Sequence, residues 1–138
     1  MPIFAIDKAV TEVCRERRGR RICETRTLEI DGGGGRNRAR LMFGDHLRGT
    51  MVGYLTRAGA AGVTLVGWLP AAAFDGFRAA LASGGRLQMH YETRDGGPGY
   101  LRRIGVGRDG EPMVACAAFS RPEAPERPQL VQAEYAPL

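Results

Sequence analysis

The sequence predicts an α+β fold: a mainly antiparallel β-barrel or strongly bent sheet of six to seven strands, with one clear helix at about 70–83. Short alternating runs of polar and apolar residues predict the strands, glycine-rich turns separate them, and one stretch has helical spacing. The 138 residues match the commonest size of one compact domain. We therefore expect a single globular domain over 1–120 and a proline-rich C-terminal tail over 121–138.

The N-terminal segment, about residues 6–18, fits either a helix or a strand. A helix would align one apolar stripe, made of Ile6, Val10, Val13 and Cys14. Asp7 would cap its start and Gly19 would end it. A strand would instead mix apolar and charged residues on both faces. The stripe favours an N-terminal helix, and the strand stays the alternative.

Four strands are expected between residues 21 and 69. RICETRTLEI ends at the glycine run DGGGG (31–35), and RNRARLMF alternates, with Ala39, Leu41 and Phe43 on one face. TMVGYLTR (50–57) follows, and the apolar run VTLVGWL (63–69) is typical of a strand covered on both faces. Because the connections are short, we expect these strands to have antiparallel neighbours.

The clearest helix lies in LPAAAFDGFRAALASGG, where Pro70 can begin it and Gly84 can end it. Its apolar residues recur at i, i+3 and i+4 spacing. The three segments RLQMHYETR, YLRRIGVGR and EPMVACAAFS then alternate or are apolar, and turn signals separate them. We expect them to form a meander, with Leu87, Met89 and Tyr91 pointing inward.

The excess of positive over negative charge is confined to the N-terminal part. Residues 1–57 hold twelve cations against seven acids, whereas residues 58–138 hold eight of each. The segment CRERRGRRIC (14–23) alone has five arginines and one glutamate. Arginine forks bind phosphate in bidentate fashion, and clustered cations attract it. This pattern predicts a small non-enzymatic binding module for an anionic partner, either nucleic acid or nucleotide phosphate.

The candidate anion-binding residues are the arginines of two stretches: Arg15, Arg17, Arg18, Arg20, Arg21, Arg36, Arg38 and Arg40. They would form one basic surface if the first strand pair brings the two stretches together. A rival hypothesis is a self-associating or protein-binding module. In it the arginines are solvated or paired with glutamates, and apolar strand edges and the tail supply the interface.

The three cysteines, Cys14, Cys23 and Cys116, are an odd number, and a reducing compartment would keep them as thiols. A hairpin turn at Arg18–Gly19 would set Cys14 opposite Cys23, but arginine is a poor first residue for such a turn. We expect Cys14 and Cys116 to be buried as small hydrophobes. The redox state of Cys14 and Cys23 stays open.

No catalytic residue, metal site or cofactor is expected. The cysteines, His46 and His90 lack the close spacing that sets two zinc ligands on one turn. The N-terminus MPIFAIDKAV does not resemble a signal peptide, and no apolar run approaches the length that spans a bilayer. We therefore expect a cytoplasmic protein with no membrane role.

Two short motifs are similar to those of PilZ domains, β-barrels that commonly bind cyclic di-GMP. Arg17 to Arg21 in RRGRR matches R-x-x-x-R, and YLTRAG (54–59) resembles [DN]-x-S-x-x-G, with Thr56 for serine and Gly59 in place. Tyr54 stands where the family has Asp or Asn. The resemblance implies a third hypothesis, a degenerate PilZ-like barrel that binds cyclic di-GMP.

Overall fold

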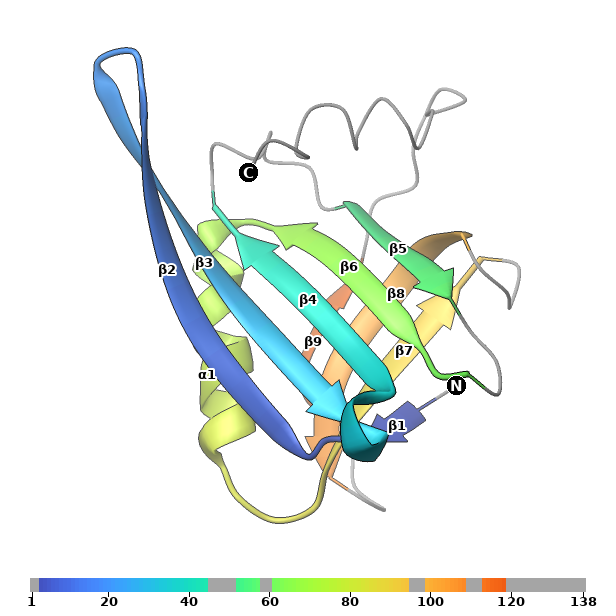
Figure 1. The fold of residues 1–138 in the computed structure, drawn as a ribbon. Helices are drawn as coiled ribbons and strands as arrows, with labels where there is room; N and C mark the ends of the chain where they lie inside the picture. The colour runs from blue at the N-terminus through green and yellow to red at the C-terminus, as the bar shows by residue number, and fades with distance from the viewer. Residues whose placement is uncertain (1–2, 45–51, 58–60, 95–98, 109–112, 119–138) are drawn as a thin grey trace.

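The structure, a computed structural model, describes residues 3–44, 52–57, 61–94, 99–108 and 113–118. Nine strands within these ranges form one strongly curled sheet, in the order β1-β7-β8-β5-β6-β4-β3-β2, with β9 paired to β8 (Figure 1). They are β1 (Ile3–Ala5), β2 (Lys8–Arg18), β3 (Arg21–Gly32), β4 (Asn37–Phe43), β5 (Val52–Arg57), β6 (Thr64–Leu69), β7 (Leu87–Thr93), β8 (Gly99–Arg108) and β9 (Met113–Ala118). The predicted α+β class with a barrel-like sheet is confirmed. The tail, 121–138, lies outside the described residues.

The N-terminal helix prediction is wrong, because residues 8–18 form β2. All eleven side chains of β2 are exposed, so no helical stripe is buried there. The segment instead pairs along its whole length with β3, and its β-branched residues Val10, Thr11 and Val13 suit that pairing. Asp7 caps no helix; its Oδ2 accepts a hydrogen bond from the Gly34 amide at 3.0 Å.

The turn between β2 and β3 also differs from the one considered for the cysteine pair. Arg18 pairs with Arg21, so the two loop residues are Gly19 and Arg20. Gly19 has φ of 64°, the left-handed backbone that the first loop position of a tight hairpin requires. Glycine adopts this conformation without strain. The first loop residue is therefore Gly19 and not Arg18, so the poor fit of arginine to the first turn position does not arise.

One pair of neighbouring strands is parallel, against expectation. β4 pairs in parallel with β6, and β5 pairs antiparallel with the other edge of β6. The prediction overlooked that a strand can itself make the return crossing. β5 carries the chain back, so β6 can run alongside β4 in the same direction. The expected meander of β7, β8 and β9 is confirmed.

The short link between β1 and β2 joins strands near opposite ends of the sheet order. The Ile6 amide donates to the Leu87 carbonyl of β7 at 3.0 Å, and the Asp7 amide donates to the Asp31 carbonyl of β3 at 2.7 Å. Gly32 permits this approach, since a Cβ there would collide with the Ala5 carbonyl oxygen and the Phe4 ring. This link holds the curl of the sheet at the base of the β2–β3 hairpin.

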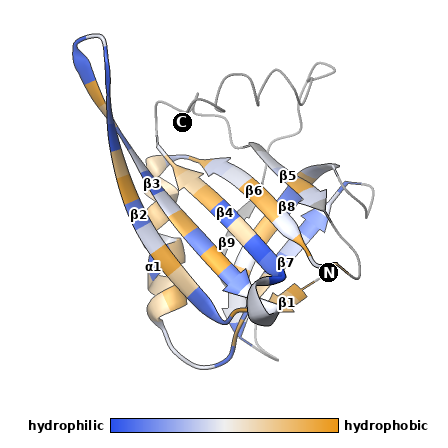
Figure 2. Cartoon of the chain, viewed as in Figure 1, coloured by the Kyte–Doolittle hydropathy of each residue, from blue (hydrophilic) through white to orange (hydrophobic). Residues whose placement is uncertain are grey.

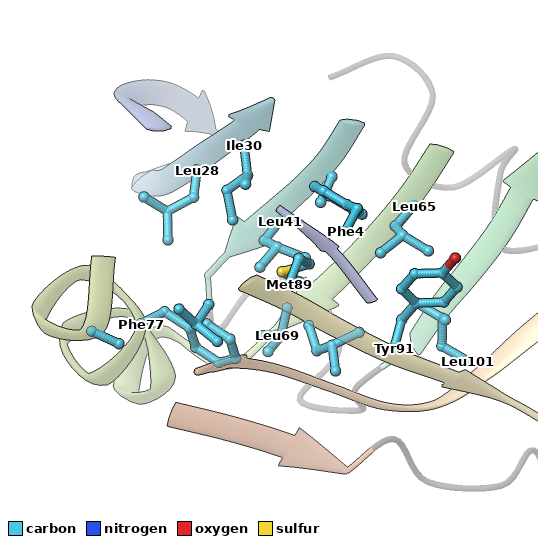
Figure 3. Packing of buried hydrophobic residues seen from close by; sticks show 14 of the residues in the cluster. Phe4, Leu28, Ile30, Leu41, Leu65, Leu69, Phe77, Met89, Tyr91 and Leu101 are labelled. Atoms are coloured by element: carbon cyan, nitrogen blue, oxygen red, sulfur yellow. The ribbon is translucent and has the colours of Figure 1, made fainter. Parts of the chain in front are cut away.

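The hollow of the sheet is filled by one hydrophobic core (Figure 3). The predicted helix is confirmed as η2 (Ala71–Ala73) followed by α1 (Phe74–Ala82), and Gly84 follows with φ of 79°. Phe74 and Phe77 of α1 pack on Phe43, with ring centroids 5.4 and 5.9 Å apart. The inward residues of β7 and β4 are buried as predicted: Leu87, Met89, Tyr91, Ala39, Leu41 and Phe43.

The opposite face of β6 is covered as well. Trp68 packs edge-on against Tyr54 of β5, with ring centroids 6.0 Å apart, and Met42 of β4 joins them in a second buried cluster. Leu65 and Leu69 of the same strand lie in the main core. The prediction that VTLVGWL is buried on both faces is therefore confirmed.

Candidate functional site

The β2–β3 hairpin extends well past the rest of the sheet (Figure 1). β4 pairs with β3 only from Arg26 to Gly32, whereas β2 follows β3 as far as Arg21. Residues 14–25 thus form a two-stranded ribbon that no third strand of the described ranges joins. Five residue pairs separate its base from its loop, which is about 17 Å at the usual strand rise. We call this segment the projecting ribbon.

The five arginines of the projecting ribbon point to both of its faces and to its tip. Leu28 and Ile30 of β3 enter the core, so the cross-strand register defines an inner face on that side. Arg15 and Arg17 lie on the inner face, because strand residues alternate. Arg18 and Arg21 oppose each other on the outer face, and Arg20 lies in the loop.

Two of these arginines are partly neutralised. Arg15 lies 3.5 Å from Glu24, and Arg18 lies 3.5 Å from Glu16. A hydrogen bond from Arg26, with the charges of Arg26 and Arg15, holds the pKa of Glu24 below its usual range, so it is ionised at neutral pH.

The other three ribbon arginines have no ion pair within the described part of the chain: Arg17, Arg20 and Arg21. Their positive charge is therefore not neutralised by an ion pair within the described residues.

The second arginine stretch lies at the other end of the hairpin. Arg38 is 3.6 Å from Asp31, and Arg40 is 3.2 Å from Glu29. Arg36 follows the short η1 turn (Gly33–Gly35). Asp31 is ten residues from Arg21 along β3, or about 34 Å. The structure therefore does not bring the two stretches into one basic surface.

A groove of about 540 Å³ lies between the projecting ribbon and the start of the helix. Its charged lining is balanced, with Arg21 and Arg26 against Glu24 and Asp75. Arg26 is already engaged, since its Nε lies 2.8 Å from Glu24 and its guanidinium lies 5.1 Å from the Phe74 ring centroid. The groove is therefore not a ready-made anion site.

Cys14 and Cys23 do not form a bridge with each other. Cys14 pairs with Thr25 and Cys23 pairs with Glu16, two residues out of the register that would oppose them, and both are free thiols. Cys14 is exposed, so the prediction that it is buried is wrong: β2 pairs with β3, but all eleven of its side chains are exposed. The side chain of Cys116 and all of His46 lie outside the described residues.

The described residues contain no group of three His, Cys, Asp or Glu side chains that could hold a metal ion. His90 lies on β7, and partial burial lowers its pKa. Among the helices of the described ranges, none is both long and apolar enough to cross a membrane.

Sequence reasoning missed three exposed aliphatic side chains on the hairpin. Val10 and Val13 of β2 are 48% and 54% exposed, and Ile22 of β3 is 69% exposed. Figure 2 shows apolar bands between the charged bands of this hairpin. The helical interpretation of 6–18 concealed the two valines. Burial periodicity could not have revealed them, because every side chain of β2 is exposed.

The two PilZ-like motifs lie apart. Arg17 and Arg21 are on the projecting ribbon, whereas Thr56 is on β5, and both β4 and β6 lie between β3 and β5 in the sheet. Gly59 lies outside the described residues. The described parts of the two motifs therefore do not form one pocket.

Comparison with known proteins found no matching family model, no matching curated protein and no matching solved structure.

Proposed function

We propose that this protein is a non-enzymatic module that binds nucleic acid through the projecting ribbon. The observation that carries the proposal is the position of Arg17, Arg20 and Arg21. They lie at the end of a ribbon that no other described strand supports, without acidic partners in the described residues. Thr25 at its base is the only buried residue of the ribbon, so the ribbon contributes little to the core, and its five arginines are suited to phosphate contacts.

The number of free arginines sets the expected salt dependence. Each phosphate contact releases condensed counterions and contributes about −0.9 to the slope of log K against log salt on a duplex. Three contacts predict a slope of about −3. If Arg15 and Arg18 also contact phosphates, the slope would steepen to about −4.5. The proposal places the protein in the cytoplasm, where the thiols of Cys14 and Cys23 stay reduced.

The test is a triple variant, Arg17→Gln/Arg20→Gln/Arg21→Gln, assayed by fluorescence anisotropy with labelled nucleic acid across a salt series. We expect the slope of log K against log salt to become shallower by about three, because each lost phosphate contact reduces the magnitude of the slope by about one. The matched control, Arg78→Gln/Arg86→Gln/Arg94→Gln, removes the same charge from exposed positions outside the hairpin.

The control should keep the wild-type slope. Equal losses in both variants would show that only net charge matters, and wild-type protein that fails to bind at low salt would refute the proposal. Urea unfolding of both variants checks that they fold.

A second candidate function is association through the free edge of β2. No described strand pairs with the outer edge of this eleven-residue strand, and Val10 and Val13 are exposed on it. Such an edge can accept another strand by main-chain hydrogen bonds. Light scattering of wild type and Val13→Lys would distinguish the two functions: a dimer that the substitution dissociates favours association, and a monomer in both counts against it.

A further inference from the structure

We infer that the nucleic acid is duplex DNA and that the projecting ribbon enters its major groove; this inference rests on the proposed function. Its starting observation is the distribution of charge around the ribbon. Arg17 lies on the inner face, Arg21 on the outer face and Arg20 at the tip. A flat anionic surface would meet only one of these faces. A groove bounded by two phosphate walls meets both.

The dimensions of the ribbon agree with this arrangement. The major groove of B-form DNA is about 12 Å wide and 8.5 Å deep and admits a two-stranded β-ribbon, whereas the minor groove is only about 6 Å wide. The ribbon projects about 17 Å beyond the sheet, roughly twice the depth of the major groove. Its tip can therefore reach the base edges while the body of the protein stays outside the groove.

Other nucleic acids fit the ribbon less well. Proteins that hold single strands stack bases on aromatic side chains, and residues 14–25 contain no aromatic residue. A-form RNA has a deep, narrow major groove that side chains cannot read. Among these ligands, only the B-form duplex offers a groove that admits a two-stranded ribbon and that can be contacted without aromatic side chains.

Ile22 adds a feature that a purely electrostatic site would not need. It lies opposite Arg17 and beside Arg21, and its side chain is 69% exposed. The major groove presents one apolar group, the C5 methyl of thymine, and aliphatic side chains contact it. In the groove, Ile22 would face this methyl while the flanking arginines reach the phosphates.

The experiment compares four labelled probes of one sequence of about 20 base pairs, two helical turns. They are duplex DNA, single-stranded DNA, duplex RNA, and duplex DNA in which uracil replaces thymine. Uracil lacks only the C5 methyl. We expect wild-type protein to bind duplex DNA at least about tenfold more tightly than single-stranded DNA or duplex RNA. The uracil duplex should bind about fourfold more weakly, the equivalent of one lost methyl contact.

The Ile22→Ala variant completes the test, since this exposed position should tolerate the change with less than about 0.5 kcal/mol effect on folding. It should bind the thymine and uracil duplexes equally. Equal wild-type affinity for single-stranded DNA or duplex RNA would overturn the inference and leave the proposed function intact. Equal wild-type affinity for thymine and uracil would overturn the placement of Ile22. Loss of binding to every probe at low salt would overturn the proposed function as well.

Discussion

The two ends of β3 have opposite roles, although one continuous ladder with β2 joins them. At the base, Leu28 and Ile30 are buried, β4 pairs on the other side, and Gly32 lies against β1. Beyond Arg26 towards the tip, β2 is the only described partner of β3, and Ile22 faces solvent. An isolated hairpin is marginally stable in water, so the base must hold the ribbon in place. The ribbon is thus an extension whose position depends on the packed base.

Charge separates the two ends in the same way. At the base, Arg38 and Arg40 lie across from Asp31 and Glu29 and are neutralised locally. At the tip, the described chain offers no acidic partner to Arg20 or Arg21. Arginines at the two ends therefore differ in how far acidic neighbours neutralise their charge. Pairing across the strands, and not composition, decides which arginines can meet a ligand.

The largest expected difference between the two ends is in packing. Leu28→Ala should lower the free energy of unfolding by roughly 2–5 kcal/mol, because Leu28 is 1% exposed and its removal leaves a cavity. Ile22→Ala should change it by less than about 0.5 kcal/mol. Urea denaturation of both variants measures this. A similar loss from Ile22→Ala would mean that the ribbon packs on the protein in solution.

Gly32 at the base and Gly19 in the hairpin loop should show smaller effects on stability, with different causes. Gly32→Ala should destabilise by about 1–3 kcal/mol, because the added Cβ has no space beside Ala5. Gly19→Ala should cost about 1–2 kcal/mol for a different reason, its positive φ, since nothing lies near its Cβ position.

Asparagine distinguishes the two causes, because it tolerates the left-handed region but needs space. Thermal unfolding should show Gly19→Asn to be milder than Gly19→Ala, and Gly32→Asn to be no milder than Gly32→Ala. The reverse order at either glycine would contradict the assigned cause.

The smallest expected effect is electrostatic and lies where the ribbon meets the base. The pKa of Glu24 is lowered mainly by its hydrogen bond from Arg26, so its ion pairs contribute above that pKa and are lost as the pH falls through it. Carboxyl titration by NMR should show Arg26→Gln raising the pKa of Glu24 more than Arg15→Gln does. A larger rise from Arg15→Gln would show that the ribbon pair is the stronger one.

Local pattern was sufficient for much of the fold. The helix at 71–82 and the inward faces of β4 and β7 followed from spacing, because their core-facing residues recur at the helical or strand period. β2 could not be recognised in this way. All its side chains are exposed, so its sequence carries no burial period, and its identity depends on a partner strand.

The sequence by itself determined that this protein has a barrel-like or bent sheet with a helix at about 70–83, and that its excess charge lies in residues 1–57. Only the tertiary structure decided that the arginines of 14–23 lie on a projecting ribbon, with Arg21 about 34 Å along β3 from the position opposite Arg38, and that Arg38 and Arg40 lie among acids at its base. The physical reason is that charge is counted along the chain, whereas neutralisation and exposure depend on which strands pair and how far they continue beyond their neighbours.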